Sequence, residues 1–378
     1  MIARPSVKGW CPGAFRPMQS GDGLIVRVRP FLARLTAAQM LGLCDLAETY
    51  GNGFIDLTNR ANLQIRGVTD GGFDTVLDGL NALGLLDETP ELEARRNIIV
   101  SPFWENDGET ARVARALLQA LPDLPELPAK FGFAVDLEPE RVLQNASADI
   151  RIERYDQGSL VRADGAIKGL PVARGEEIAA VLELGEWFAA NRTAENRRMA
   201  HILSHRSLPE SWQLCAPIAA TRQPKPGQHP LGTLVGAAFG QMHVETLTRL
   251  IQQNDVQAIR LTPWRLILLE GAQARNLDGF VTHPDDPLLK IDACPGAPFC
   301  ASATVKTREL ARRLAPSISG SLHISGCAKG CARKSGADMV FVGNAGGFDL
   351  VRKGHAWDAP EKSGLRPDDI LAELASHP

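Results

Sequence analysis

The sequence predicts an α+β protein that contains an internal duplication. Residues 57–68 (LTNRANLQIRGV) align without gaps with residues 261–272 (LTPWRLILLEGA), 204 positions further along the chain. Both segments lie within the same predicted order of strand, helix, strand, turn and strand. Four cysteines near the C-terminus add another feature, because they form two close pairs in loops of small residues.

The first copy is defined by alternating apolar residues and by a helix cap. Thr36 has the place of a helix N-cap, and Gln39 three residues later completes a capping box. Gly51 is expected to end this helix at the C′ position. The expected elements are a strand at 24–29, a helix between Thr36 and Gly51, and strands at 54–58 and 62–66.

The second copy repeats this order. Its expected elements are strands at 233–239, 256–262 and 265–270 and a helix at 243–253. Such βαββ units form antiparallel-rich sheets with helices on one face. After the copies we expect a helix at 301–314, a strand at 322–325 and a hairpin of 338–342 and 348–352 around a turn at 343–347.

The domain boundaries are predicted from the repeat and from a proline-rich segment between the two copies. Residues 217–230 contain four prolines and are expected to form a linker before the second copy. The predicted units are half domain 1 at 1–86, a first larger domain without cysteine pairs at 87–216, the linker at 217–230, half domain 2 at 231–281 and a cysteine-bearing domain at 282–378.

The cysteine pairs are typical of an iron–sulfur cluster. Cys294 and Cys300 enclose five residues, whereas Cys327 and Cys331 enclose three. Four thiolates held by two tight loops are the ligands of a [4Fe–4S] cluster, and glycine lets the backbone approach the cluster closely. Zinc is the alternative, although an enclosure of five is unusual for zinc. Disulfides require an oxidising compartment.

Composition excludes several classes of partner. The chain has 378 residues, 44% of them hydrophobic and 22% charged, as in an ordinary globular protein. A net charge of −3 lacks the excess of positive charge that is typical of nucleic-acid-binding proteins. No apolar run is long enough to cross a bilayer. No secretory signal is visible at the start of the sequence, so we expect a cytoplasmic location.

Cations are concentrated in the first half of the chain. Arg95 is one of them, and those expected to bind an anionic ligand are Arg27, Arg29, Arg60, Arg66, Arg96 and Lys130. The second copy has Ala237 and Phe239 in the corresponding strand and Trp264 in place of Arg60. Solvated surface charge explains any single arginine, but the asymmetry between the copies favours a site for a ligand with several carboxylates.

Two histidine features remain. His201 and His205 are four residues apart, so on a helix they share a face and could bind a second metal, although a polar helical face is the commoner explanation. His323 precedes Cys327 on a predicted strand and is expected to support the cysteine loop. Cys44 lies in an apolar helical pattern and is expected to be buried.

The cysteine segment 325–333 (SGCAKGCAR), together with the first pair, resembles the cluster motif of the nitrite and sulfite reductases that carry sirohaem beside a [4Fe–4S] cluster. The repeat resembles their ferredoxin-like half domains, and the resemblance implies that the two larger domains are reductase-like and that the C-terminal one holds the cluster. It also implies that Cys331 bridges cluster and sirohaem in a reductase. The cations matched to tetrapyrrole carboxylates are Arg27 or Arg29, Arg60, Arg96 and Lys130.

Two departures distinguish the chain from these reductases. Lys130 is followed by Phe131 and Gly132, so the second lysine of the reductase pair is missing, and Lys329 replaces an asparagine. With segments 11–23, 57–67 and 261–265, the chain resembles the precorrin-3B synthases, a branch of the same superfamily.

The second resemblance implies an oxygen-dependent monooxygenase that converts precorrin-3A to precorrin-3B in aerobic cobalamin biosynthesis, by hydroxylation at C20 and closure of a γ-lactone. Dioxygen, a mononuclear non-haem iron and an electron donor, either an NADH-dependent reductase or a ferredoxin-like protein, are implied as well. The alternatives are a sirohaem-dependent assimilatory nitrite or sulfite reductase and a non-catalytic iron–sulfur protein.

Overall fold

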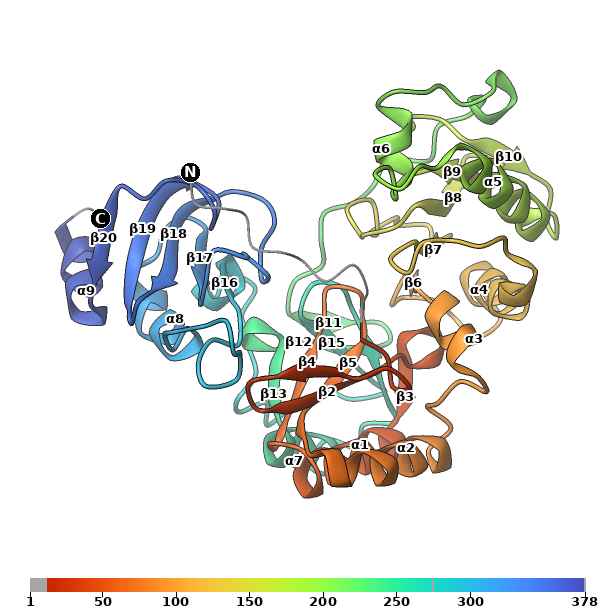
Figure 1. Ribbon diagram of the computed structural model, residues 1–378. Helices are drawn as coiled ribbons and strands as arrows, with labels where there is room; N and C mark the ends of the chain where they lie inside the picture. Colours follow the sequence, from red (N-terminus) through yellow and green to blue (C-terminus); the bar gives the residue numbers. More distant parts are fainter. Residues whose placement is uncertain (1–11, 274, 377–378) are drawn as a thin grey trace.

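The computed structural model describes residues 12–273 and 275–376, and within them lie four five-stranded sheets. Figure 1 shows two lobes, the C-terminal domain and the domain of strands β6–β10, standing on either side of the duplicated half domains. The four sheets and their helices confirm the α+β class, and each part has a hydrophobic core of its own.

The first half domain contributes most of one antiparallel sheet. Its strands, in spatial order, are β1 (Met18–Ser20), β2 (Gly23–Val28), β5 (Leu63–Val68), β4 (Phe54–Leu57) and β13 (Gln241–His243). Helix α1 (Ala37–Thr49) begins at the predicted cap, where Thr36 accepts from the Gln39 N–H and the Gln39 side chain accepts from the Thr36 N–H.

The second half domain repeats this arrangement. Its sheet has the order β11 (Gly227–His229), β12 (Gly232–Gly236), β15 (Leu266–Glu270), β14 (Ala258–Leu261) and β3 (Arg34–Thr36), and its helix is α7 (Val244–Gln253). Each copy therefore lends one short edge strand to the sheet of the other: β3 pairs with β14, and β13 pairs with β4. This exchange covers an edge of each sheet.

One hydrophobic core joins the two copies. Leu43 of α1, Leu247 of α7, Ile65 of β5 and Ile267 of β15 are all fully buried in it. Figure 1 shows α1, α2 (Phe73–Ala82) and α7 on the same side of the paired sheets. The opposite face is therefore turned toward the two larger domains.

The middle domain carries the mixed sheet β10-β9-β8-β7-β6. Its strands are β6 (Ile98–Val100), β7 (Phe133–Asp136), β8 (Ile150–Tyr155), β9 (Gly158–Ala163) and β10 (Leu170–Val172), and its helices are α3 (Pro90–Arg95), α4 (Glu109–Gln119), α5 (Glu177–Asn191) and α6 (Met199–Leu203). Helices α4 and α5 pack on the sheet through a core that includes Leu117 and Phe188.

The C-terminal domain has the order β16-β17-β18-β19-β20, with its first three strands parallel. Its elements are β16 (Ile291–Ala293), α8 (Arg308–Leu314), β17 (Leu322–Ser325), β18 (Ala337–Asn344), β19 (Gly347–Gly354), β20 (Lys362–Leu365) and α9 (Pro367–Ser376). None of the helices in the described ranges is long and apolar enough to cross a membrane.

Two sequence expectations for this domain were wrong. The helix expected at 301–314 begins only at Arg308, because the preceding backbone pairs with the cysteine loop: the Ala297 N–H donates to Val305 O at 2.9 Å and the Ala303 N–H to Cys300 O at 2.9 Å. The hairpin is confirmed, but its turn is reduced to Ala345 and Gly346, which both have positive φ.

Candidate functional site

The topology of the C-terminal sheet brings the two cysteine pairs to one edge. Cys294 directly follows β16, and Cys327 follows β17 by two residues. These strands are parallel neighbours with Ala293 opposite Ile324. Because adjacent parallel strands end at the same edge of a sheet, the loops that carry Cys294–Cys300 and Cys327–Cys331 leave from the same place.

Small residues allow the two cysteine loops to touch. A Cβ on Gly326 would lie 2.6 Å from the Ala303 Cβ and 3.3 Å from the Gly296 Cα. Gly296 itself has a φ of +69°, a conformation that favours glycine. A larger side chain at either glycine would separate the loops. The close approach of these backbones is what a cluster held from two sides requires.

The four sulfur atoms are electrostatic neighbours. Burial raises the pKa of the Cys294 thiol, although the N–H groups of Gly326 and Gly296 act against this rise, and the Gly326 N lies 3.1 Å from the Cys294 Sγ. Burial also raises the pKa of Cys331, as do Cys294, Cys327 and Cys300. Cluster binding would therefore have to displace protons from these thiols.

Within the described ranges, no group of three or more His, Cys, Asp or Glu side chains is arranged to hold a metal ion. A single zinc ion would need its sulfur ligands at about 2.3 Å from one point. A cubane instead takes each thiolate on a different iron, so its ligands stand further apart. The cluster therefore stays a prediction, supported by the four neighbouring thiols and their small-residue loops.

The other cysteines are separate from this group. Cys44 is buried as expected, and burial raises the pKa of its thiol to about 12. Cys215 is half-buried and its backbone pairs with Gly169 in the middle domain. Cys11, part of the segment on which the family resemblance rests, lies outside the described residues.

The Cys294–Cys300 loop packs against the first half domain. Ser20 Oγ donates to the Phe299 carbonyl at 2.7 Å, and Arg66 Nη2 donates to the same carbonyl at 2.7 Å. A Cβ on Gly21 would lie 2.6 Å from the Pro298 carbonyl oxygen. The hairpin of β1 and β2 and the end of β5 thus form the surface on which the cysteine loop rests.

Next to this contact, polar side chains form a row across the sheet face that the helices leave uncovered. Arg27 on β2 is opposite Gln64 on β5, which is opposite Asp56 on β4. Arg27 Nη2 donates to Gln64 Oε1 at 2.7 Å. Since side chains alternate along a strand, Gln64 and Arg66 share this face, so a ligand on the row would lie beside the cysteine loop.

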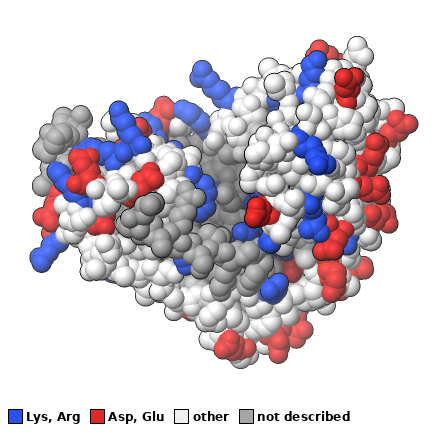
Figure 2. Space-filling model, turned by 45° about the horizontal axis from the view of Figure 1, so that its top comes forward, with Lys and Arg blue, Asp and Glu red and all other residues white. Residues whose placement is uncertain are grey.

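The other end of β5 points toward the middle domain. Arg60, in the turn before β5, donates to the Lys130 carbonyl at 3.2 Å and to Ser147 Oγ at 3.1 Å. Arg60 and Lys130 are therefore brought together, as the sequence analysis required of two groups that bind one ligand. Figure 2 shows Lys and Arg side chains, together with Asp or Glu, on the sides of the two lobes that face each other.

Three predicted ligand cations are instead buried and paired within the protein. Arg29 Nη1 lies 2.9 Å from Glu93 Oε1, and Arg96 pairs with Asp87 at 2.6 Å. Arg66 pairs with Asp22 at 3.0 Å. A guanidinium neutralised in this way has few donors left for a ligand. We therefore change the role proposed for these three from ligand binding to support of the site.

Arg95 also has an internal role, since it donates to the carbonyls of Leu121 and Leu124. Arg27, Arg60 and Lys130 keep their predicted role in ligand binding in our proposal, because Arg27 lies on the polar row and Arg60 contacts the Lys130 carbonyl. Sequence reasoning missed Gln64, whose place two residues before Arg66 on a strand was a usable signal. It also missed Glu93, because nothing local to Glu93 reveals its distant partners.

The predicted histidine pair lies away from the cysteines, at the end of α6 in the middle domain. His201 and His205 are both exposed, and their ring centroids are 6.0 Å apart. Helix α6 ends at Leu203, before His205, and no third ligand joins the pair among the described residues. The pair therefore carries no proposal for a second metal.

His323 lies on β17 beneath the second cysteine loop. It is opposite Asp292 of β16, which forms ion pairs with Arg265 and Arg333. The ring is 1% exposed, and its Nε2 has no hydrogen-bond partner in the described part of the chain. Burial lowers the pKa of His323 to about 4, so the imidazole is neutral at physiological pH.

Replacing His323 with glutamine should change how stability depends on pH. With a folded pKa near 4 and an unfolded pKa near 6.5, the unfolded chain binds the extra proton first as the pH falls. We expect His323 alone to lower the free energy of unfolding of the wild type by up to roughly 3 kcal/mol between neutral and acidic pH. Urea unfolding of wild type and His323→Gln across that range should reveal the difference, and parallel pH profiles would contradict it.

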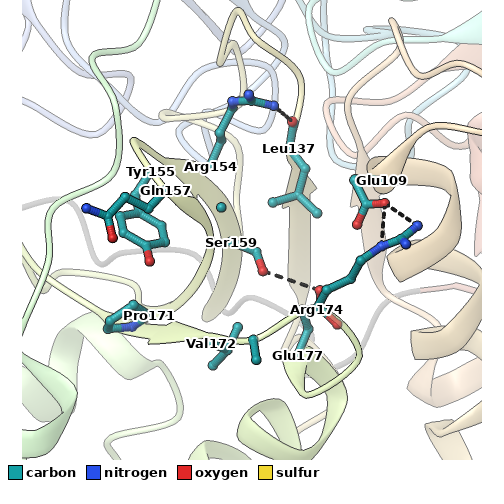
Figure 3. A pocket seen from close by; sticks show the side chains of 12 residues that line it. Glu109, Leu137, Arg154, Tyr155, Gln157, Ser159, Pro171, Val172, Arg174 and Glu177 are labelled. Carbon is teal, nitrogen blue, oxygen red and sulfur yellow. Dashed lines mark hydrogen bonds and ion pairs between the residues drawn. The ribbon is translucent and has the colours of Figure 1, made fainter.

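The middle domain also contains a cavity of about 500 Å³, shown in Figure 3. It is lined only by residues of that domain, including Tyr155, Arg174 and Glu177. Its charged groups already have partners within the protein: Arg174 pairs with Glu109 at 2.9 Å, Glu177 pairs with Arg112, and Arg154 donates to the Leu137 carbonyl. The cysteines and the polar row lie elsewhere, so we do not place the functional site in this cavity.

Comparison with known proteins defines the class. Residues 16–83 match the nitrite/sulfite reductase ferredoxin-like half domain. The solved structure of the NirA protein of Mycobacterium tuberculosis superimposes with a TM-score of 0.63, covering 94% of this chain and 81% of NirA at 20% identity. The fold is therefore that of the nitrite and sulfite reductases.

Proteins of similar sequence show to which family within this class the chain belongs. A precorrin-3B synthase of Sinorhizobium sp is 31% identical over 400 residues, which cover 93% of this chain and 84% of the relative. A ferredoxin–nitrite reductase of Synechococcus elongatus is 24% identical, with coverage of 88% and 78%. The chain belongs to the precorrin-3B synthase family, within the nitrite and sulfite reductases.

Proposed function

We propose that this protein is an oxygen-dependent monooxygenase that converts precorrin-3A to precorrin-3B. The observation that carries the proposal is the position of the polar row of Arg27 and Gln64. Gln64 lies on β5, which has Arg60 and Lys130 near its start and the loop of the first cysteine pair near its end. A macrocycle with several carboxylates would be held at its edge by guanidinium and ammonium groups beside the cysteines.

The four cysteines are the proposed ligands of a [4Fe–4S] cluster. When bound, this group supplies electrons one at a time. The chain's own contribution is to hold it against the sheet: two small-residue loops bring the thiols together, and the Gly326 N–H donates to the Cys294 sulfur. Such an N–H contact stabilises thiolate charge and tunes the reduction potential.

The cationic side chains would bind and orient the substrate. Arg27 is held in place by Gln64 and Arg60 by Ser147, so the positions of both guanidinium groups are fixed before a ligand arrives. In the proposed reaction one atom of dioxygen enters the macrocycle as the C20 hydroxyl oxygen, while an acetate side chain closes the γ-lactone. The second oxygen atom leaves as water with two electrons and two protons from an external donor.

A reductase with bound sirohaem is the second candidate, supported by the nitrite reductase relatives and by the NirA-like fold. The same cationic face would then hold a tetrapyrrole as cofactor instead of substrate. The sequence Lys130-Phe131-Gly132 counts against this function, because Gly132 stands where the second lysine of the reductase pair is expected. Among the described residues, we assign no other side chain to the role of that second lysine.

Anaerobic purification followed by one assay separates these functions. We expect iron and sulfide in equal amounts, about four of each per chain, and no sirohaem bands in the visible spectrum. Added precorrin-3A, dioxygen and a chemical reductant should yield a product heavier by one oxygen atom, labelled when ¹⁸O₂ is used. Sirohaem in the purified protein, or turnover of nitrite or sulfite without reaction of precorrin-3A, would favour the reductase.

A further inference from the structure

Arg66 lies at the junction between the first half domain and the cysteine loop. It is 4% exposed, and its guanidinium contacts the β1–β2 hairpin, Asp56 of β4 and the cysteine loop. It donates to Asp22 in the β1–β2 turn at 3.0 Å and to Ser20 Oγ at 3.0 Å. On the other side it donates to the carbonyl of Phe299, the residue before Cys300, at 2.7 Å.

A second arginine from the C-terminal domain completes the contact. Arg308 at the start of α8 donates to Asp56 at 3.1 Å, and Asp56 also lies 3.8 Å from Arg66. The neighbouring Thr307 donates its hydroxyl to the Cys294 carbonyl. Both ends of the Cys294–Cys300 loop are thus tied, directly or through one residue, to a buried network of two arginines and two aspartates.

The second half domain provides a natural comparison. Asp56 and Arg66 correspond by the repeat to Arg260 and Glu270, which also form an ion pair, at 3.1 Å, but with the charges exchanged. Arg260 donates to the carbonyls of Pro102 and Trp104 in the middle domain. Each copy therefore uses an ion pair on equivalent strands to fasten a different domain, and only the first copy's pair reaches a cysteine loop.

We propose that Arg66 is a positioning residue for the iron–sulfur cluster, which fixes the Cys300 side of its loop relative to the substrate face of the sheet. This inference rests on the proposed function, because it requires that the cysteines hold a cluster. Gln64 and Arg66 project from the same face of β5, so one strand sets the position of the substrate and of the cluster loop. A lysine could replace the charge but not the fork of donors that reaches Asp22, Ser20 and Phe299 together.

The test compares Arg66→Lys and Ser20→Ala with the matched control Arg260→Lys. In anaerobically purified protein we expect Arg66→Lys to lose its cluster to a chelator about tenfold faster than wild type, consistent with loss of one charge-assisted hydrogen bond. Its reduced cluster should show an altered EPR signature and a shifted midpoint potential. Ser20→Ala should show smaller changes of the same kind, because it removes one hydrogen bond to Phe299.

Arg260→Lys changes an equally buried arginine in the equivalent ion pair and should leave the EPR signature, the potential and the rate of cluster loss at wild-type values. Wild-type values in Arg66→Lys would overturn the inference while leaving the proposed function intact. If Arg66→Lys does not fold, wild-type values in Ser20→Ala overturn it. A wild type without a cubane would instead overturn the proposed function, and with it this inference.

Discussion

Cys294→Ala is expected to remove the iron–sulfur chromophore from the purified protein. Cys294 is the most buried of the four cysteines, and its sulfur accepts from the Gly326 N–H. Alanine deletes one of four ligands and adds no group that could replace it, so we expect the iron content to fall from about four atoms per chain to below about one. Iron and acid-labile sulfide assays, together with visible absorbance, measure this directly.

The matched control is Cys215→Ala, which removes a half-buried thiol of the middle domain. We expect it to keep its full iron content. Equal iron in both variants would contradict the assignment of the cluster ligands. If zinc were bound by the wild type and lost only in Cys294→Ala, the cysteines would form a zinc site and the redox function would fail.

Arg60→Glu is expected to abolish binding of precorrin-3A while preserving the cluster. Arg60 is held by the Lys130 carbonyl and by Ser147 between the half domain and the middle domain. Reversal of its charge replaces attraction for a carboxylate by repulsion, so we expect affinity to fall by at least about 100-fold. Anaerobic titration followed by absorbance or fluorescence measures binding without turnover.

Two further variants test whether the loss of affinity is specific to the Arg60 guanidinium. Arg174→Glu makes the same charge change at an exposed site beside the middle-domain cavity and should bind normally. Arg60→Lys keeps the charge and should recover part of the affinity, but not all, since lysine lacks the planar fork. Weak binding by Arg174→Glu as well would indicate a general charge effect and no specific role for Arg60.

The secondary structure near the predicted site was largely predictable, because its signals are local. The Thr36 capping box and the strand expected at 24–29 require only a few adjacent residues, and the structure confirms the cap and places a strand at Gly23–Val28. The helix expected at 301–314 failed for the opposite reason. Residues before Arg308 satisfy their backbone by pairing with a loop that is itself folded over, and composition does not reveal such a contact.

The cations illustrate the same limit. The sequence placed Arg27, Arg29 and Arg66 on strands of one sheet, but could not say which were already neutralised. Glu93 is 64 positions from Arg29, and the Phe299 carbonyl is 233 positions from Arg66. Partners so far apart in the chain become neighbours only when the domains pack.

The sequence by itself determined the α+β class, the duplication and the four cysteines, since these depend on periodicity, caps and spacing within short segments. Only the tertiary structure decided that the copies exchange edge strands, that both cysteine loops leave one sheet edge, and that Arg29, Arg66 and Arg96 form buried ion pairs within the protein. The physical reason is that burial and charge pairing depend on which distant segments meet, and no short segment carries that information.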